Sequence, residues 1–248
     1  SFLQRIYSKE IKIITIEDPI EYHLPGISQT QVEEEKGYTF LSGLRSALRQ
    51  DPDVIMVGEI RDAETAKTAV QSALTGHLVF STLHTNNAAG VIPRLIDLDV
   101  NPQTLVSALS LSVAQRLVRV LCPICKKEKV ISPREKNIID SIINKAKENG
   151  KDLGRAGIDL TQEYKIYEPV GCDKCNQTGY KGRMGIFEAI QTDEEIEKII
   201  LGKPSERDIK KISAKQGTLN MQEDGIIKVL KGITSLEEVR SVVDLLEE

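Results

Sequence analysis

"DPDVIMVGEIRD", residues 51–62, contains four consecutive apolar residues, 54–57, followed directly by Gly58 and Glu59. A short apolar run between polar residues is typical of a strand that is buried on both faces of a parallel sheet. A carboxylate at the tip of such a strand needs an explanation. Either Glu59 caps the next helix or pairs with a neighbouring charge such as Arg61, or it belongs to a functional site.

The segments around this strand alternate between strand and helix patterns. Asp62 is a suitable N-cap, and Gly76 a suitable C-terminal stop, for a helix over residues 62–76. This alternation predicts an α/β fold in which helices cover both faces of a mostly parallel sheet. The expected strands are 53–60, 77–84 and the start of 11–22, up to Pro19; the expected helices are 40–50, 62–76, a short broken helix over 86–100 and a long helix over 101–121.

Polar side chains follow three of the expected strands at the point where each one ends. In parallel sheets, ligands bind at the carboxyl ends of the strands, so these side chains predict a site along one edge. Each cluster also has a structural explanation, since Glu-Asp-Pro is a common turn and a single histidine at a strand end usually makes an ordinary hydrogen bond. Three coincident clusters favour the site; they are Glu17 and Asp18, then Gly58, Glu59 and Arg61, then Thr82, His84 and Thr85.

The residues at these strand ends suit triphosphate hydrolysis, which needs Mg²⁺ at the phosphates and an oriented water. Glu59 is the candidate for the water. Because Gly58 precedes it, a metal-side carboxylate is missing from this strand, and Glu17 and Asp18 are expected to supply that negative charge. His77 and His84 flank the strand at 77–84 and are candidates for contact with the γ-phosphate.

All four cysteines lie in two Cys-x-x-Cys pairs, Cys122/Cys125 and Cys172/Cys175. Two such pairs supply the four thiolates of a closed, structural Zn²⁺ site, and the spacing favours zinc over the alternatives. Two disulfides would need an oxidising compartment, which nothing in the sequence indicates. A redox pair usually lies where a strand enters a helix, whereas "RVLCPIC" is expected to follow a helix. Residues 126–171 are then expected to form a hairpin of helix and loop on the metal.

Composition excludes some classes of function. The formal net charge is −4, aromatic residues make up 4% of the chain and there is no tryptophan, which argues against nucleic-acid binding. The uncharged stretch 68–93 carries too many polar side chains to cross a membrane. The changes in composition predict three domains: a core of alternating strands and helices over 1–121, a zinc-binding subdomain over 122–189 and a helical subdomain over 190–248.

Four segments resemble the ATPases that drive type II secretion and type IV pilus assembly. They are "ITIEDPIEY" (14–22), "GLRSALRQDPDVIMVGEIRDAETA" (43–66), "TGHLVFSTLHTNNA" (75–88) and the cysteine segments "AQRLVRVLCPIC" and "GCDKCNQTGYKGRMGIFE". The resemblance implies a RecA-like fold, ATP and Mg²⁺ as ligands, a homo-hexameric ring and a mechanical output. It also implies a cytoplasmic location, with attachment to the inner membrane through a platform protein, and no nucleic-acid partner.

In the same resemblance, Glu59 is the Walker B glutamate that orients or activates water. Glu17 and Asp18 are the aspartate-box acids around Mg²⁺, and His77 and His84 are the histidine-box pair. Gly58 and Arg61 belong to the Walker B segment beside the nucleotide, while Arg45 and Arg49 match basic positions without an assigned role. The tetracysteine module marks the assembly and secretion branch.

The chain contains no phosphate cradle of the form G-x-x-x-x-G-K-[ST]. Because the chain opens on what reads as the tail of a helix, we expect upstream sequence to carry the cradle and residues 1–248 alone to bind nucleotide weakly or not at all. Two alternatives stay open: a non-hydrolysing, zinc-containing interaction module on a RecA-like remnant, and a nucleic-acid motor.

Overall fold

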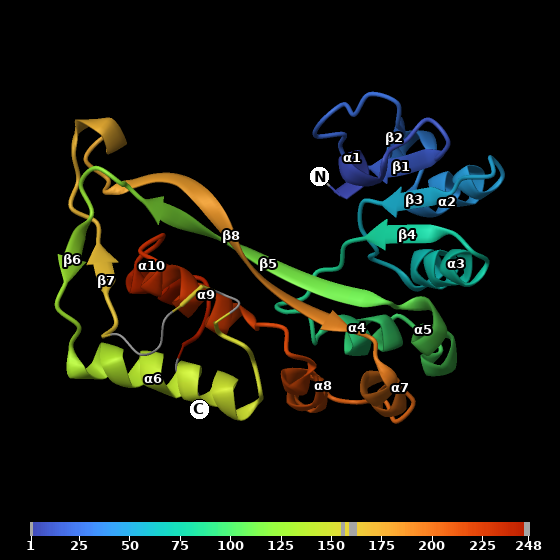
Figure 1. Ribbon diagram of the computed structural model, residues 1–248. Coiled ribbons are helices and arrows are strands. Elements are labelled where there is room, and N and C mark those ends of the chain that lie inside the picture. The colour runs from blue at the N-terminus through green and yellow to red at the C-terminus, as the bar shows by residue number, and fades with distance from the viewer. Residues whose placement is uncertain (1, 155–156, 159–162, 246–248) are drawn as a thin grey trace. The chain divides into compact units, whose positions relative to one another are not determined.

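The computed structural model describes residues 2–154, 157–158 and 163–245 (Figure 1). Its contacts define two compact units: unit 1 comprises 1–110 and 192–209, and unit 2 comprises 111–191 and 210–248. The boundaries of these units differ from those of the three domains expected above. The division into three domains stays a prediction.

Unit 1 is built on a sheet of four strands in the order β2-β1-β3-β4, and every neighbouring pair is parallel. The strands are β1 (Ile13–Glu17), β2 (Ser28–Gln31), β3 (Val54–Val57) and β4 (Leu78–Ser81). The expected α/β class with a parallel sheet is confirmed. β2 was not expected, because it contains no apolar residue; its pairing with β1 supplies the hydrogen bonds that hold it as a strand.

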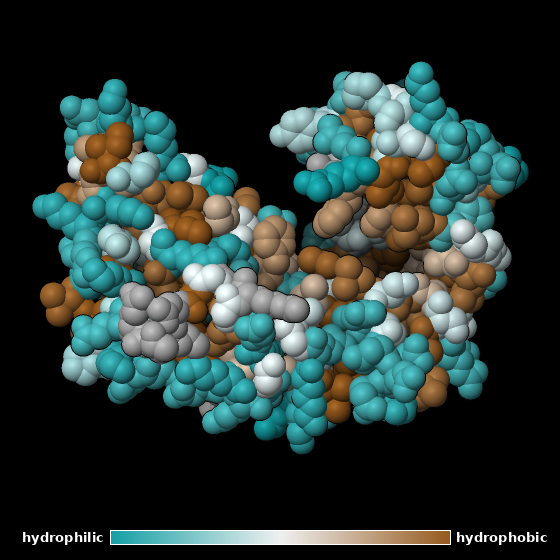
Figure 2. Space-filling view, viewed as in Figure 1, coloured by the Kyte–Doolittle hydropathy of each residue, from teal (hydrophilic) through white to brown (hydrophobic). Residues whose placement is uncertain are grey.

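Successive side chains of a strand point to opposite faces of the sheet, and helices cover these two faces unequally. The short helix α1 (Phe2–Ile6) packs Leu3 against Ile13 and Val54 on one face. α2 (Phe40–Leu48) and α3 (Ala63–Leu74) contact the sheet through buried residues such as Leu44. Figure 2 shows an apolar surface over β3 and β4. Leu78, the first residue of β4, is 49% exposed.

The starts of α2 and α3 follow from their capping residues. Thr39 Oγ1 accepts the backbone N–H of Ser42 at 3.2 Å, and Ser42 Oγ accepts the backbone N–H of Thr39 at 2.8 Å, which forms a capping box. The predicted N-cap Asp62 accepts the N–H of Thr65 at 2.8 Å. Gly76 follows α3 with a positive φ of 104°, as expected for a residue that ends a helix.

The rest of unit 1 contains η1 (Glu34–Lys36), α4 (Val91–Asp97), α5 (Pro102–Ala108), α7 (Glu194–Ile200) and the first half of α8 (Glu206–Ser213).

The long helix expected over 101–121 is wrong. The chain forms the seven-residue helix α5, leaves helical geometry at Leu109 and continues as the eleven-residue strand β5 (Leu111–Leu121). β5 pairs along its length with the antiparallel β8 (Tyr180–Gln191). Its hydrogen-bonding partner thus comes from a segment about seventy residues later, which no local pattern in 101–121 reveals.

Unit 2 packs helices against the β5–β8 ribbon around a core of buried aliphatic residues that includes Val118, Ile139 and Ile226. The expected helix within 126–171 is present as α6 (Pro133–Glu148), and β6 (Lys127–Lys129) pairs with β7 (Ile166–Glu168); the part at 155–156 and 159–162 lies outside the described residues. The short helices expected after 190 are present; those in unit 2 are η3 (Ala214–Gln216), α9 (Met221–Leu230) and α10 (Leu236–Arg240).

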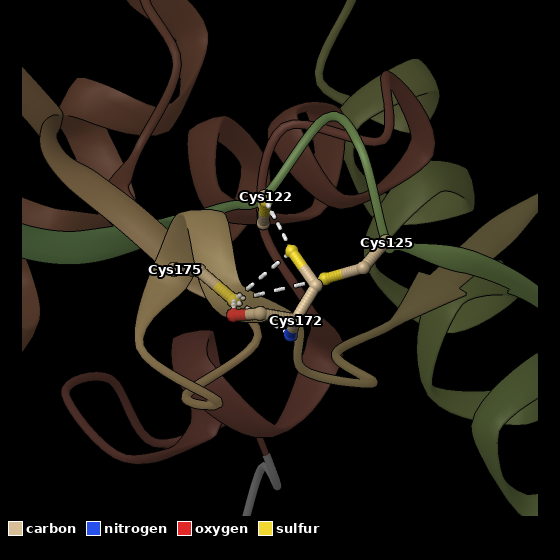
Figure 3. A group of neighbouring side chains, drawn as sticks. All are labelled: Cys122, Cys125, Cys172 and Cys175. Carbon is tan, nitrogen blue, oxygen red and sulfur yellow. Dashed lines mark hydrogen bonds between the residues drawn. The ribbon is translucent and has the colours of Figure 1, made fainter.

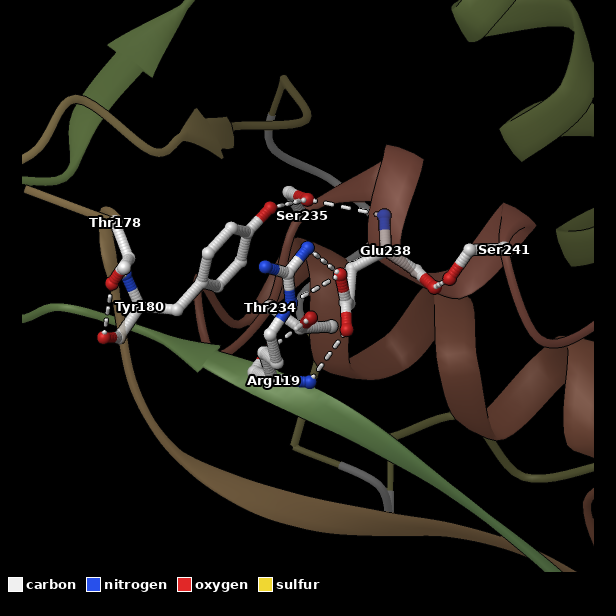
Figure 4. Close-up of polar contacts among 7 residues, drawn as sticks. All are labelled: Arg119, Thr178, Tyr180, Thr234, Ser235, Glu238 and Ser241. Atoms are coloured by element: carbon white, nitrogen blue, oxygen red, sulfur yellow. Dashed lines mark hydrogen bonds and ion pairs between the residues drawn. The ribbon is translucent and has the colours of Figure 1, made fainter.

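A network of polar contacts ties α10 to the ribbon (Figure 4). The guanidinium of Arg119 donates from Nε and Nη2 to Glu238 at 2.9 and 2.6 Å, and it stacks over the ring of Tyr180 at 4.1 Å. The hydroxyl of Tyr180 lies 2.8 Å from that of Ser235, the N-cap of α10. The network fixes the start of α10 against both strands.

A buried ion pair joins the segment after α6 to α9. Lys151 Nζ lies 2.9 and 2.7 Å from the two carboxylate oxygens of Glu223, and the two side chains are 2% and 4% exposed. Glu223 Oε2 also accepts the backbone N–H of Asn220 in a capping box. A charge buried this deeply depends on its partner.

We expect Lys151→Met to lower the free energy of unfolding by about 3–5 kcal/mol, because it leaves the carboxylate of Glu223 buried without its cation. Urea unfolding followed by circular dichroism measures the difference. Lys147→Met, at an exposed position of α6, is the matched control and is expected to change little. Equal stability of the two variants would contradict the structural role of the pair.

Candidate functional site

The carboxyl ends of β1, β3 and β4 meet at one edge of the sheet. Ile16 is aligned with Val57, and Val57 with Ser81, so the residues that follow lie side by side. The N–H of Gly58 donates to the carbonyl of Ile16 at 2.7 Å, and the hydroxyl of Thr82 donates to the carbonyl of Gly58 at 2.7 Å. The predicted convergence of the three strand ends is therefore present.

Glu59 contacts two side chains at this edge. Arg61 donates to its Oε1, and His84 Nε2 lies 2.9 Å from its Oε2. Glu59 is 14% exposed, while the side chains of Arg61 and His84 are 57% and 82% exposed. The hydrogen bond from Arg61, opposed by partial burial and helped by His84, lowers the pKa of Glu59 below its usual value. Pairing with Arg61, one of the two explanations given by the sequence, is thus present together with contact to His84.

Glu17 and Asp18 lie at the carboxyl end of the neighbouring strand β1. Glu17 Oε1 accepts hydrogen bonds from the hydroxyl of Thr15 at 2.5 Å and from Nε2 of Gln29 at 2.8 Å. The pKa of Arg61 is raised, chiefly by its hydrogen bond to Glu59 and more weakly by the charge of Asp18. Gln29 was missed in the sequence because β2 itself was missed.

Gly58 has a steric reason to be glycine. A Cβ at this position would lie 3.1 Å from the carbonyl oxygen of Ile16, 3.2 Å from the ring of Phe40 and 3.5 Å from the Cα of Glu17. A side chain there would crowd the backbone of β1. An acid at this position would require β1 or the ring of Phe40 to move by a few tenths of an ångström.

His77 lies away from this edge. It precedes β4, at the amino ends of the strands, and its Nδ1 is 2.9 Å from the carbonyl of Ser72 and 3.3 Å from the hydroxyl of Thr75, at the end of α3. The structure therefore brings together Glu17, Asp18, Gly58, Glu59, Arg61 and His84 but not His77, whose expected contact with a phosphate stays a prediction without support from its position.

The four cysteines form one cluster in unit 2 (Figure 3). Their sulfurs all lie within 4.8 Å of one another, and the shorter separations are 3.9 Å for Cys122–Cys172, 3.8 Å for Cys125–Cys175 and 3.7 Å for Cys172–Cys175. Four thiolates around a tetrahedral Zn²⁺, with Zn–S bonds of about 2.3 Å, stand about 3.8 Å apart. A disulfide would need about 2.05 Å, and all four cysteines are free.

Backbone N–H groups point at the sulfurs. Cys175 Sγ accepts the N–H of Cys172 at 3.2 Å and that of Gly179 at 3.3 Å. Burial opposes ionisation, but these bonds and the neighbouring thiols lower the pKa of Cys175 to about 6. Gly179 has a φ of 75°, and a Cβ there would lie 2.4 Å from Pro169, so glycine is required. The knuckle is thus shaped to hold a thiolate.

The expectation that "RVLCPIC" follows a helix is wrong, because Cys122 follows the strand β5. No helix begins at this pair, however, since the chain turns and enters β6. The strand-to-helix arrangement of redox pairs is therefore absent from this described segment.

No helix in the described part of the chain has the length and apolar character that a membrane crossing requires.

Comparison with known proteins identifies the family. The type II/IV secretion system protein family matches residues 1–241. The chain belongs to this family. Type II secretion system protein E of Aeromonas hydrophila is 47% identical over 240 residues, which cover 97% of this chain and 44% of the relative. The type IV pilus assembly ATPase PilB of Thermus thermophilus is 46% identical over 239 residues, covering 96% of this chain and 25% of the relative. The chain thus spans less than half the length of these relatives.

A solved structure shares the fold. The pilus retraction motor PilT with bound ADP matches with a TM-score of 0.64 and 26% identity, covering 98% of this chain and 55% of that chain. The family predicted from the sequence motifs and the expected fold class are confirmed.

We expect Arg61→Gln to raise the pKa of Glu59 toward the usual value of a glutamate, because the strongest hydrogen bond to its carboxylate is lost. Carbon-detected NMR titration of the carboxyl group measures this. A lowered pKa stabilises the fold above the unfolded-state pKa, and this contribution disappears as the pH falls through the folded-state value. Arg45→Gln, which removes a 3.7 Å pair with Glu64, is the control. An unchanged Glu59 pKa in Arg61→Gln would contradict the pairing.

Proposed function

We propose that this chain is part of an ATP-hydrolysing motor subunit that powers type IV pilus assembly or type II protein secretion. Membership of the family supports this, as do the curated relatives, which are named as components of those two systems. The observation that carries the proposal is the contact of Glu59 with His84 beside the end of β1, which brings acids and an imidazole to one sheet edge.

At this edge Glu59 is the group that orients the attacking water. Its lowered pKa keeps it ionised near neutral pH and makes it a weak base. A weak base serves better by accepting a hydrogen bond from water than by removing its proton. Each carboxylate oxygen accepts more than one hydrogen bond, so water would bind Glu59 beside Arg61 and His84.

Glu17 and Asp18 are the residues that would hold Mg²⁺. Carboxylate oxygens are the ligands that this ion prefers, and the ion neutralises charge on the phosphates during transfer. Gln29 and Thr15 hold the carboxylate of Glu17 in place by their hydrogen bonds. Residues 1–248 contain no phosphate cradle, so the proposal assigns to them the groups at the reacting phosphate and not the main nucleotide-binding contacts.

The mechanical part of the proposal follows the family resemblance of the sequence motifs. The subunit would act in a homo-hexameric ring at the cytoplasmic face of the inner membrane, and hydrolysis would move neighbouring subunits against a membrane platform protein.

The four cysteines are proposed to hold one structural Zn²⁺. The sulfur separations match a tetrahedron, and four thiolates leave no position for a catalytic water. The metal would connect the end of β5 to the turn before β8. It would so hold together the end of the β5–β8 ribbon at which Leu121 pairs with Tyr180.

In the gene product that contains residues 1–248, we expect Glu59→Gln to retain ATP binding and to lose hydrolysis by roughly a hundredfold or more, because the amide keeps the shape but not the charge of the acceptor. Turnover is measured by phosphate release and binding by calorimetry. Glu64→Gln, at an exposed position of α3, is the control. Unchanged hydrolysis in Glu59→Gln would reject the assigned role, and absence of ATP binding in the parent would favour a non-hydrolysing interaction module.

We expect one zinc per chain by elemental analysis and loss of that metal in Cys172→Ser, with a lower melting temperature, because binding of a structural metal is folding free energy. Asp173→Asn, in the same knuckle, keeps its acceptor for Gln177 and is expected to retain the metal. A zinc content that is the same in Cys172→Ser as in the parent would exclude zinc ligation.

A further inference from the structure

His84 lies on a segment that is held at two points. Residues 82–90 join β4 to α4 without helix or strand geometry. At the first point, Thr82 is bound to the end of β3: its hydroxyl donates to Gly58, and its carbonyl accepts the N–H of Ile60 at 3.0 Å. At the second point, Nδ2 of Asn87 donates to Oε1 of Glu206 at 2.7 Å. His84 stands between the two.

The second attachment comes from a part of unit 1 that is distant in sequence. Asn87 and Glu206 are 119 residues apart. Asn87 also accepts the N–H of Gly90 through Oδ1 at 3.0 Å, so its amide orientation is set from both ends. A Cβ at Gly90 would lie 3.5 Å from Oε2 of Glu206 and 3.5 Å from Cβ of Thr85, which shows how closely this carboxylate approaches the segment.

Glu206 is not needed to cap its own helix. Ser205 and Asp208 cap the start of α8 with bonds of 3.0 Å from the N–H of Ser205 to Asp208 and 3.3 Å in return. Ile209, which is fully buried, anchors the helix in unit 1. α8 therefore presents the carboxylate of Glu206 from a position that is fixed by other residues.

The ring of His84 depends on its backbone for placement, because its side chain is 82% exposed and gains little from packing. Its contact at 2.9 Å with Glu59 requires the backbone of residues 82–87 to stay where the two attachments hold it. We propose that Glu206 is a positioning residue that acts through Asn87 to hold His84 against Glu59. The relevance to hydrolysis rests on the proposed function; the positioning itself does not.

The positioning is tested by NMR on residues 1–248. The probe is the set of NOE cross-peaks between the ring protons of His84 and the γ-protons of Glu59. Glu206→Ala is expected to lose these cross-peaks, whereas Glu206→Gln keeps them, because its amide oxygen still accepts from Asn87. Cross-peaks that persist in Glu206→Ala, or that vanish equally in Glu206→Gln, overturn the proposal.

A second pair of variants exchanges donor and acceptor. Asn87→Asp sets two carboxylates against each other and is expected to lose the cross-peaks. Adding Glu206→Gln restores a donor opposite the new carboxylate and is expected to recover them. Failure of the double variant to recover cross-peaks that the single variant has lost overturns the proposal. This pair decides the matter should Glu206→Ala fail to fold.

Hydrolysis gives an independent readout in the gene product that contains residues 1–248. There, Glu206→Ala is expected to lower kcat about tenfold with KM unchanged, and Glu206→Gln to restore it. Loss of the cross-peaks with an unchanged kcat would support the positioning and reject the role of His84 in hydrolysis. Persistence of the cross-peaks rejects the positioning whatever the turnover.

Discussion

The parallel pairing of β3 between β1 and β4 is the constraint on which the candidate site depends. It fixes where three chain segments emerge from the sheet, and the hydrogen bonds of Gly58 to Ile16 and Thr82 lock that arrangement. A shift of one residue would turn every side chain of β3 to the other face and separate Glu59 from His84. The close approach at Gly58 adds a steric limit, since a larger residue would press on β1. The chemistry at this edge therefore follows from the register of the strands.

Local signals predicted much of this arrangement from the sequence. The apolar run at 54–57 predicts a buried strand from local sequence alone. Asp62 marks the start of α3 through a local hydrogen bond that it accepts from the N–H of Thr65. The spacing of the two Cys-x-x-Cys pairs predicted that their four sulfurs lie together, and the structure places them in one cluster. The convergence of Glu17, Glu59 and His84 needed one further rule, that parallel strands end at one edge.

What the sequence did not predict depends on partners that are distant along the chain. β5 reads locally as a helix, and β2 lacks apolar residues; each is a strand because of the strand beside it. His77 precedes β4 and His84 follows it. The two histidines therefore lie at opposite edges of the sheet, although they are close together in the sequence. The contact of Asn87 with Glu206 spans 119 residues between two ordinary polar side chains, and no motif marks it.

Neither unit is a continuous stretch of chain, because the chain passes between them after residues 110, 191 and 209. The N–H of Thr192 donates to the carbonyl of Ser110 at 3.0 Å, so the excursion through residues 111–191 leaves and re-enters unit 1 at the same place. A chain that ends at residue 110 lacks α7 and Glu206, whose carboxylate contacts Asn87. Joining Ser110 to Thr192 through a few small residues removes residues 111–191 instead and keeps α7 and Glu206. Because residues 210–248 complete unit 2, a chain that keeps unit 1 alone must also end after Ile209.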